Sequence, residues 1–250
     1  MSSLRRNRIY PTLLLKDNGL VKTFNFESPK YVGDPINAIK IFNEKKVDEL
    51  VLLNIDDRTS LSLNFDLIER ISKQCRMPLS FGGGIRSLAD VKRLVSLGVE
   101  RIVFSSSAFD NPSLIKDTVK CIGSQSVVVV INYKVVTDFF GIKTRKVFTN
   151  RGSKTIRDSF SQAVKLIESL NVGEIIFQCI DNDGLKSGLD MSLVETVYDE
   201  LETPFSILGG LASYHEVTTL SHRYPYVGIS AGAFFVFTGK FNSVLISYLE

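Results

Sequence analysis

Short apolar runs alternate with longer amphipathic segments along the whole chain. Such runs, bounded by glycine or polar residues, are typical of buried β-strands, and the segments between them have helical periodicity. Strands are predicted at residues 9–14, 50–54, 79–82, 102–105, 127–132, 174–178, 205–209 and 227–231. Alternation of strand and helix implies a parallel sheet, and eight strands are the number that closes a (β/α)8 barrel. We therefore expect a single TIM-barrel domain of the α/β class over residues 1–250.

Capping residues mark where several helices begin. An acceptor side chain before a proline, or a serine three residues before an acidic residue, satisfies free N–H groups of the first helical turn. Such pairs occur at Asp34-Pro35, Ser87-x-x-Asp90, Asn111-Pro112 and Ser213-x-x-Glu216. Residues 16–33 and 134–157 are predicted to be long loops, which in a compact domain are often functional.

Three segments recur at a nearly constant spacing. "DELVLLNID" and "GEIIFQCID" begin at residues 48 and 173, 125 residues apart. "GGIRS" and "GGLAS" begin at residues 83 and 209, which are 126 residues apart. "SSSAF" and "SAGAF" begin at residues 105 and 230, again 125 residues apart. The repeat predicts two related half-barrels of four strand–helix units each, at about residues 1–122 and 123–250.

Composition narrows the classes of function. The formal net charge of +3 is too small and too scattered to predict nucleic-acid binding. No signal-peptide core and no apolar run long enough to span a membrane occurs, so a cytoplasmic protein is expected. The three cysteines lack paired spacing and are expected to be buried thiols in a reducing compartment. His215 and His222 have no Cys or His companions, so neither a metal site nor a cofactor is predicted.

Two glycine segments, "FGGGIRS" and "LGGLAS", follow predicted strands and lead into capped helices. In a β/α barrel these places lie at the ligand-binding end. Glycines let backbone N–H groups approach an anion closely, and a helix N-terminus adds its dipole. The small residues of "SSSAF" and "SAGAF" follow the next strands and could complete each cradle. A plain tight turn explains either glycine pair alone, but two corresponding copies predict a ligand with a phosphate at each end.

A resemblance extends nearly end to end, carried by "RIYPTLLLKDNGLVKTFNFESPKYVGDP", "NPSLI", "GEIIFQCIDNDGLKSGLD" and the repeated segments. The chain resembles HisF, the cyclase subunit of imidazole glycerol phosphate synthase in histidine biosynthesis. The resemblance implies a substrate with two phosphates, a HisH-type glutaminase docked on the amino-terminal face of the barrel, and ammonia passing through the barrel. Together with the glycine segments it predicts phosphate binding by Gly83, Gly84, Ser105, Ser106, Gly184, Gly209, Gly210, Gly232 and Ala233.

At the catalytic positions the chain departs from that family. The resemblance implies an acid–base pair of aspartates at the ends of the first and fifth strands, and these positions hold Leu14 and Asn132. Neither side chain titrates usefully near neutral pH, and loss of general acid–base help lowers a rate by about 10²–10⁴-fold per group. Other ionisable residues near the same end are candidate participants: Lys22, Asp181 and Asp183.

A charged residue stands at the start of four predicted strands. The resemblance assigns these residues to a ring that closes the bottom of the barrel and gates ammonia: Arg8, Glu49, Arg101 and Glu174. Their position at strand starts puts them at that face independently of the resemblance. The alternative role is a structural network of salt bridges.

Three functions compete. The first is a HisF-like subunit that lost cyclase chemistry and conducts ammonia from a HisH-type glutaminase to another acceptor enzyme. The resemblance suggests a sugar amidotransferase that makes acetamidino groups in surface-polysaccharide (lipopolysaccharide) synthesis. The second is a working cyclase that forms imidazole glycerol phosphate and AICAR from PRFAR and ammonia, with Asp181 or Asp183 as a substitute acid. The third, a phosphate-sugar isomerase, needs the same missing aspartates, so the sequence argues against it.

Overall fold

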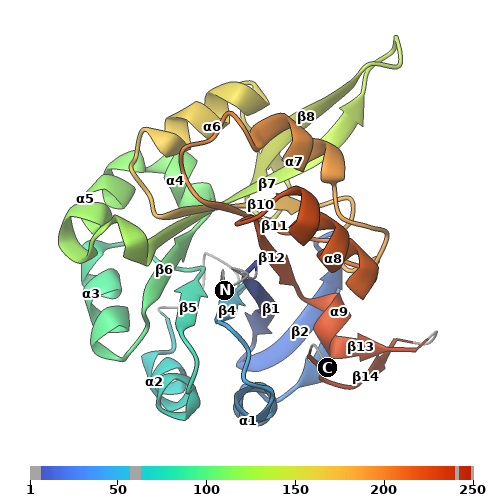
Figure 1. Ribbon diagram of the computed structural model, residues 1–250. Coiled ribbons are helices and arrows are strands. Elements are labelled where there is room, and N and C mark those ends of the chain that lie inside the picture. Colours follow the sequence, from blue (N-terminus) through green and yellow to red (C-terminus); the bar gives the residue numbers. More distant parts are fainter. Residues whose placement is uncertain (1–6, 57–62, 240–241, 249–250) are drawn as a thin grey trace, which may run out of the picture.

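The computed structural model describes residues 7–56, 63–239 and 242–248. Eight parallel strands pair side by side, and the last pairs back to the first, so the sheet closes into a barrel (Figure 1). In order around the barrel they are β1 (Ile9–Lys16), β4 (Leu50–Asn54), β5 (Leu79–Gly82), β6 (Arg101–Phe104), β7 (Val127–Thr137), β10 (Glu174–Cys179), β11 (Phe205–Leu208) and β12 (Gly228–Ala231). The predicted (β/α)8 fold is confirmed.

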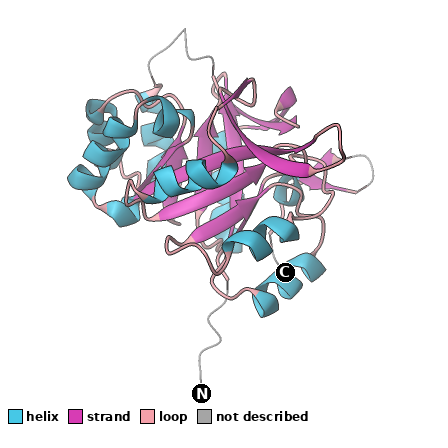
Figure 2. Ribbon diagram, turned by 90° about the horizontal axis from the view of Figure 1, so that it is seen from above, coloured by secondary structure: helices cyan, strands magenta, loops and turns pink. Residues whose placement is uncertain are grey.

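Helices surround the barrel on its outer face (Figures 1 and 2). The longer ones are α1 (Pro35–Lys45), α2 (Phe65–Gln74), α3 (Leu88–Ser96), α5 (Pro112–Ile122), α6 (Phe160–Glu168), α7 (Met191–Val197) and α8 (Tyr214–Arg223). Two short helices, α4 (Ser106–Asp110) and α9 (Ala233–Val236), directly follow β6 and β12, and a 3-10 turn (Ser124–Ser126) precedes β7. Each crossover from one barrel strand to the next therefore contains at least one helix.

The two segments predicted as long loops contain β-hairpins. β2 (Gly19–Phe24) pairs antiparallel with β1 and with β3 (Glu27–Gly33). β7 extends beyond the barrel and pairs with β8 (Lys143–Thr149), which pairs with β9 (Lys154–Thr155). This second hairpin projects from the barrel at the upper right of Figure 1. The loop prediction is wrong for both segments. A small pair, β13 (Phe237–Thr238) and β14 (Ser243–Val244), lies near the end of the chain.

The predicted helix caps are confirmed. In each of the four cases the capping side chain accepts a hydrogen bond from the N–H group three residues later, at Asp34, Ser87, Asn111 and Ser213. Ser87 and Asp90 form a complete capping box. The carboxylate of Glu216 instead accepts from the N–H of Ala212, at 3.3 Å. The starts of these helices therefore follow from local sequence.

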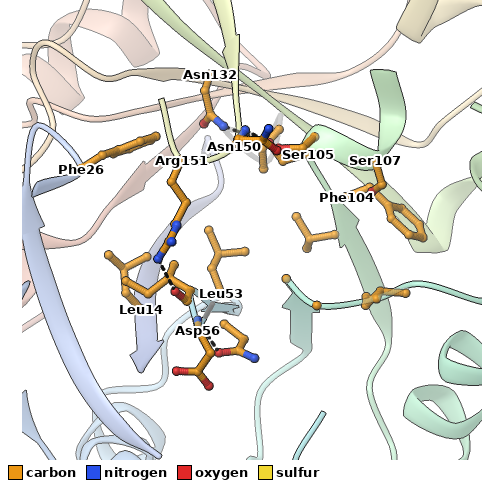
Figure 3. Close-up of a pocket in the computed structure, with 18 of the residues that line it drawn as sticks. Leu14, Phe26, Leu53, Asp56, Phe104, Ser105, Ser107, Asn132, Asn150 and Arg151 are labelled. Atoms are coloured by element: carbon orange, nitrogen blue, oxygen red, sulfur yellow. Dashed lines mark hydrogen bonds between the residues drawn. The ribbon is translucent and has the colours of Figure 1, made fainter. Parts of the chain in front are cut away.

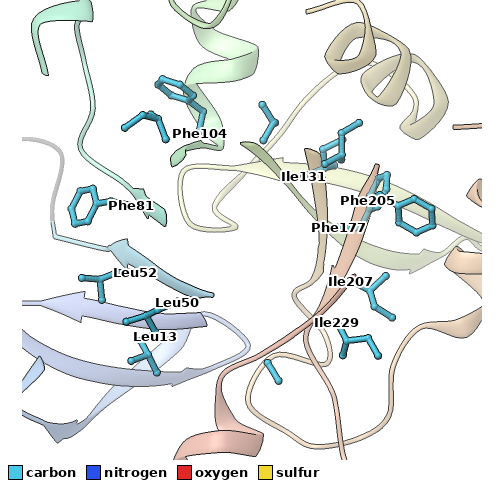
Figure 4. Close-up of a cluster of buried hydrophobic side chains, with 14 of the residues drawn as sticks. Leu13, Leu50, Leu52, Phe81, Phe104, Ile131, Phe177, Phe205, Ile207 and Ile229 are labelled. Atoms are coloured by element: carbon cyan, nitrogen blue, oxygen red, sulfur yellow. The ribbon is translucent and has the colours of Figure 1, made fainter. Parts of the chain in front are cut away.

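The barrel strands contribute to two separate apolar clusters, because successive side chains of a strand point to opposite faces. The larger cluster lies between the strands and the helices, and Figure 4 shows part of it around Leu13, Phe81 and Phe177. The smaller cluster fills the barrel interior with Tyr10, Val51, Val103, Val128, Val130, Ile176 and Leu208, with Leu53 packed against it. The lumen is thus lined mainly by apolar side chains between its two polar ends.

The repeated sequence segments fall on corresponding elements of the two halves of the barrel. In the repeat, β4, β5 and β6 of the first half correspond to β10, β11 and β12 of the second. The expectation of three buried thiols is wrong in part: Cys179 is buried, Cys75 is half-buried and Cys121 is exposed. Within the described ranges, no helix is long and apolar enough to cross a membrane.

Candidate active-site cavity and charge ring

A cavity of about 410 Å³ opens at the carboxyl ends of the barrel strands (Figure 3). Its volume lies in the range of small-molecule sites. The strands supply mainly apolar side chains and three amides, including Asn54 at the end of β4, and the loops beyond them supply polar and charged groups. The floor residues are Leu14, Leu53, Val103, Val130, Asn132 and Gln178. A ligand could therefore rest on apolar surface while polar groups orient it.

The two positions where catalytic aspartates were expected both line this cavity. Leu14, on β1, is 8% exposed, and Asn132, on β7, is 7% exposed. Asn132 Nδ2 donates to Ser105 Oγ at 2.9 Å, and Asn132 Oδ1 is buried without a hydrogen-bond partner. Both residues therefore line the cavity, and neither position carries a carboxylate.

The first predicted phosphate cradle forms one wall of the same cavity. Gly83 and Gly84 have φ of 87° and 79°, and a Cβ at Gly83 would lie only 1.9 Å from Asn54 O. Ser105 and Ser106 follow β6, and the Ser106 hydroxyl accepts from the N–H of Asn150 at 2.9 Å. Glycine at position 83 is thus required by close approach of two backbone segments, whether or not an anion binds there.

Several cavity residues were missed from the sequence. Asn150 and Arg151 come from the turn between β8 and β9, and Arg151 Nη1 donates to Ile55 O at 3.1 Å across the cavity (Figure 3). Asp56 is the only carboxylate among the described residues that line the cavity. Its Oδ1 accepts from the N–H of Asp17 at 2.8 Å. Asp56 ends the repeated "DELVLLNID" segment, which was the available signal for it.

The second predicted cradle surrounds a separate and much smaller cavity of about 10 Å³. It brings together all the second-half residues assigned to phosphate binding: Gly184, Gly209, Gly210, Gly232 and Ala233. Space of this size holds about one water molecule. A Cβ at Gly232 would lie 3.1 Å from Cε of Lys22, so the lysine side chain runs beside this backbone. The two glycine cradles are similar in sequence, but the cavities beside them differ in volume, about 410 Å³ for the first and about 10 Å³ for the second.

The remaining candidate participants are engaged away from the larger cavity. Lys22 and Asp183 are both buried and form an ion pair, Nζ to Oδ1 at 2.7 Å, and Thr23 Oγ1 donates to Asp183 Oδ2 at 2.8 Å. Asp181 is exposed, and its Oδ2 accepts from the N–H of Val135 at 2.8 Å. Neither aspartate lines the cavity that holds Leu14 and Asn132. Each carboxylate has a structural partner where it lies.

The four predicted ring residues meet at the amino ends of the strands. Arg8 pairs with Glu174 and lies 3.5 Å from Glu49, while Arg101 pairs with Glu49 at 3.1 Å and with Glu174 at 2.5 Å. The charges alternate around a closed cycle. Ser80 donates to Glu49 at 2.5 Å, and Tyr10 and Ser206 donate to Glu174. The predicted ring is therefore present, directly below the apolar lumen.

The ring keeps its buried carboxylate charged. Burial by itself would raise the pKa of Glu174, but Arg101 and Arg8 beside it, together with Ser206, hold that pKa below the ordinary glutamate value. Burial likewise opposes the charge of Arg8, and the neighbouring Glu174 raises the pKa of the guanidinium above its usual range. These shifts favour the charged forms of Glu174 and Arg8, and the ion pairs of the ring close the bottom of the barrel.

A closed (β/α)8 barrel with a ligand-sized cavity at the carboxyl ends of its strands defines the class of protein. No group of three or more His, Cys, Asp or Glu residues suited to a metal ion occurs in the described part of the chain. The family described as "Histidine biosynthesis protein" matches residues 8–242.

Several named proteins are similar to this chain over most of its length. A Vibrio vulnificus protein provisionally named imidazole glycerol phosphate synthase subunit hisF3 is 42% identical over 97% of this chain and 93% of its own. A Pseudomonas aeruginosa protein with the provisional name hisF2 is 43% identical over 97% and 96%. Imidazole glycerol phosphate synthase subunit HisF of Exiguobacterium sibiricum is 35% identical over 90% and 86%. The chain belongs to the HisF family.

Proposed function

We propose that this chain is the ammonia-conducting subunit of a glutamine amidotransferase complex and has lost the cyclase chemistry of its family. A HisH-type glutaminase would dock on the amino-terminal face of the barrel and release ammonia below the charge ring. The ammonia would cross the apolar lumen and leave through the cavity that contains Leu14 and Asn132. The acceptor would be an enzyme that converts a sugar acetamido group into an acetamidino group.

The observation that carries the proposal is the contrast between the two ends of the barrel. At the amino end, all four ring charges are present and in contact. At the carboxyl end, both expected aspartates are replaced by side chains that carry no proton near neutral pH, Leu14 and Asn132. A subunit that still conducts ammonia but no longer catalyses cyclisation would have this combination, a charge ring without the acid–base pair.

The alternative, an active cyclase with a substitute acid, needs a carboxylate in the cavity. Asp183 is held by Lys22 and Thr23, and Asp181 by the backbone of β7, so neither supports that role. Asp56 is the one described carboxylate on the cavity wall, and it lies on the loop after β4. Asp56 is therefore the residue by which the alternative can be tested.

The cyclase test uses the purified chain with PRFAR and an ammonium salt. We expect imidazole glycerol phosphate to form at least roughly 10⁴-fold more slowly than with a HisF that has both aspartates, because two acid–base groups are missing. Leu14→Asp combined with Asn132→Asp should raise the rate if the rest of the site is intact. Ordinary turnover by the unaltered chain, abolished by Asp56→Asn, would establish the alternative instead.

The partner test uses a purified HisH-type glutaminase. We expect the two chains to co-elute as a heterodimer and glutamine hydrolysis to increase on mixing. The surface control is a charge reversal on the opposite, carboxyl-terminal face, Lys146→Glu on β8, which should leave complex formation unchanged. No co-elution and no stimulation with any such glutaminase would remove the basis for the proposed role.

A further inference from the structure

Two buried side-chain atoms in the described ranges have no hydrogen-bond partner, and they lie at opposite ends of the barrel. Arg8 Nε belongs to the charge ring at the amino ends of the strands. Asn132 Oδ1 belongs to the cavity at the carboxyl ends. The first is a donor and the second an acceptor. Arg8 Nε still lies 3.5 Å from Glu49 Oε2, in an ion pair that compensates its charge. Asn132 Oδ1 has no such neighbour, and since a buried polar group without a partner is unfavourable, it marks a place where a small polar molecule would be stabilised.

The side-chain amide of Asn132 makes one hydrogen bond, through its nitrogen. Nδ2 donates to Ser105 Oγ at 2.9 Å, which leaves Oδ1 on the side away from Ser105 (Figure 3). The residue is 7% exposed and lines the cavity. Its register partner on β10 is Gln178, a second amide on the same wall. Asn132 therefore offers a lone carbonyl oxygen to whatever reaches the floor of the cavity.

The floor around this oxygen is neutral. Its other residues from the strands are Leu14, Leu53, Val103 and Val130. The charged residues of the cavity come from loops: Asp56 after β4, Arg86 after β5 and Arg151 between β8 and β9. An apolar floor disfavours a cation, because the cation loses hydration without gaining an opposite charge. The carbonyl oxygen thus selects a neutral hydrogen-bond donor.

We propose that Asn132 Oδ1 is a binding site for neutral ammonia where the lumen meets the cavity, an inference that rests on the proposed function. Ammonia has N–H bonds that can donate to Asn132 Oδ1.

The experiment follows the side-chain amide signals of Asn132 and Gln178 by NMR in the isolated chain. Ammonium chloride is added at alkaline pH, where much of it is free ammonia, and at neutral pH, where almost all is ammonium; sodium chloride is the salt control. We expect saturable shifts that depend on the concentration of free ammonia alone. The signal of Asn182, whose Nδ2 donates to Gly188 O at 2.9 Å, should stay in place.

Two variants test the role of the oxygen, with the Gln178 signal as the readout. Asn132→Leu should weaken half-saturation by free ammonia roughly five- to tenfold, the loss of about one hydrogen bond. Asn132→Asp should make the shift depend on ammonium at neutral pH. Equal binding by wild type and Asn132→Leu, or no saturable shift in wild type, would overturn the inference and leave a site for water only. Either result leaves the glutaminase test untouched, so the two proposals can fail separately.

Discussion

Glu174 shows at the scale of one residue how a buried charge is kept ionised. Its side chain is almost inaccessible to solvent and contacts Arg8, Arg101, Tyr10 and Ser206. We expect Glu174→Gln to lower the free energy of unfolding by about 3 kcal/mol, because it leaves the partly buried Arg8 and Arg101 with one carboxylate between them. Chemical denaturation at neutral pH measures the change.

The loss of unfolding free energy caused by Glu174→Gln should become smaller as the pH falls. The folded-state pKa of Glu174 is below the ordinary value of 4.5, so its contribution is complete above that value and disappears as the pH falls through the folded-state pKa. The difference between wild type and variant should therefore shrink in acid. The matched control is Glu69→Gln, which removes an exposed pair with Lys73 and should change nothing measurable. A constant difference down to strong acid would contradict this explanation.

Gly83 tests whether the cavity wall depends on the absence of a side chain. With φ of 87° and a Cβ position 1.9 Å from Asn54 O, Gly83→Ala requires the backbone after β5 to separate from the end of β4. We expect destabilisation by more than about 3 kcal/mol in thermal and urea unfolding. Gly141→Ala is the control, because it has a similar φ of 81° and nothing within 4 Å, and should lose only about 1 kcal/mol.

At the scale of elements, Asp190 joins a helix to the projecting hairpin. It caps α7 by accepting from the N–H of Leu193 at 3.0 Å. It also accepts from Tyr133 Oη at 2.9 Å and from Arg145 Nη2 at 3.2 Å, on β7 and β8. One carboxylate therefore fixes three elements, and the hydrogen bonds from Ser192 and Arg145 lower its pKa although burial alone would raise it.

We expect Asp190→Ala to destabilise the protein by about 2–3 kcal/mol, more than the roughly 1 kcal/mol typical of a helix cap, because Tyr133 and Arg145 lose their acceptor. Asp34→Ala, which removes only a cap on α1, is the matched comparison. Hydrogen exchange should also increase in β8 for Asp190→Ala and stay unchanged there for Asp34→Ala. Equal effects of the two substitutions would show that the link to the hairpin is energetically unimportant.

The hairpins are the elements that the sequence did not reveal, and their turns explain why. Asn25 and Phe26 both have positive φ, 52° and 68°, the conformation of a tight hairpin turn. Asn-Gly is the usual signal for such a turn, and a phenylalanine there is uncommon. Asn150 and Arg151, at the turn after β8, also have positive φ, and their place in the cavity depends on that unpredicted hairpin. The cavity wall was therefore only partly predictable.

At the scale of the whole molecule, the barrel was predictable because it follows from strand periodicity. The charge ring was predicted from the resemblance to HisF, and the place of its members at strand starts agrees with it: Arg8, Glu49, Arg101 and Glu174. The inequality of the two glycine cradles could not be predicted. One residue beside the smaller cradle is Lys22, which lies on a hairpin far away in sequence and packs against Gly232.

The two predicted half-barrels lead to a test of the entire fold. Residues 1–122 and 123–250 meet along two strand pairs, β6 with β7 and β12 with β1. The charge ring is also shared, with three members in the first half and Glu174 in the second. Each half alone would expose two sheet edges and half of the lumen, which favours self-association. We propose that the halves are nevertheless the natural units of assembly.

When the fragments 1–122 and 123–250 are expressed together, we expect a soluble heterodimer with cooperative thermal unfolding, measured by light scattering and circular dichroism. Each fragment alone should form homo-oligomers or precipitate. The control is a break between Gly98 and Val99, also a turn but inside the first half, where Gly98 has φ of 94°. That break places β6 and its partner strand β5 on different fragments, so the yield of soluble heterodimer should be lower. Equal recovery for both breaks would mean that the barrel closes as one cooperative unit and that the sequence repeat has no counterpart in how the chain assembles.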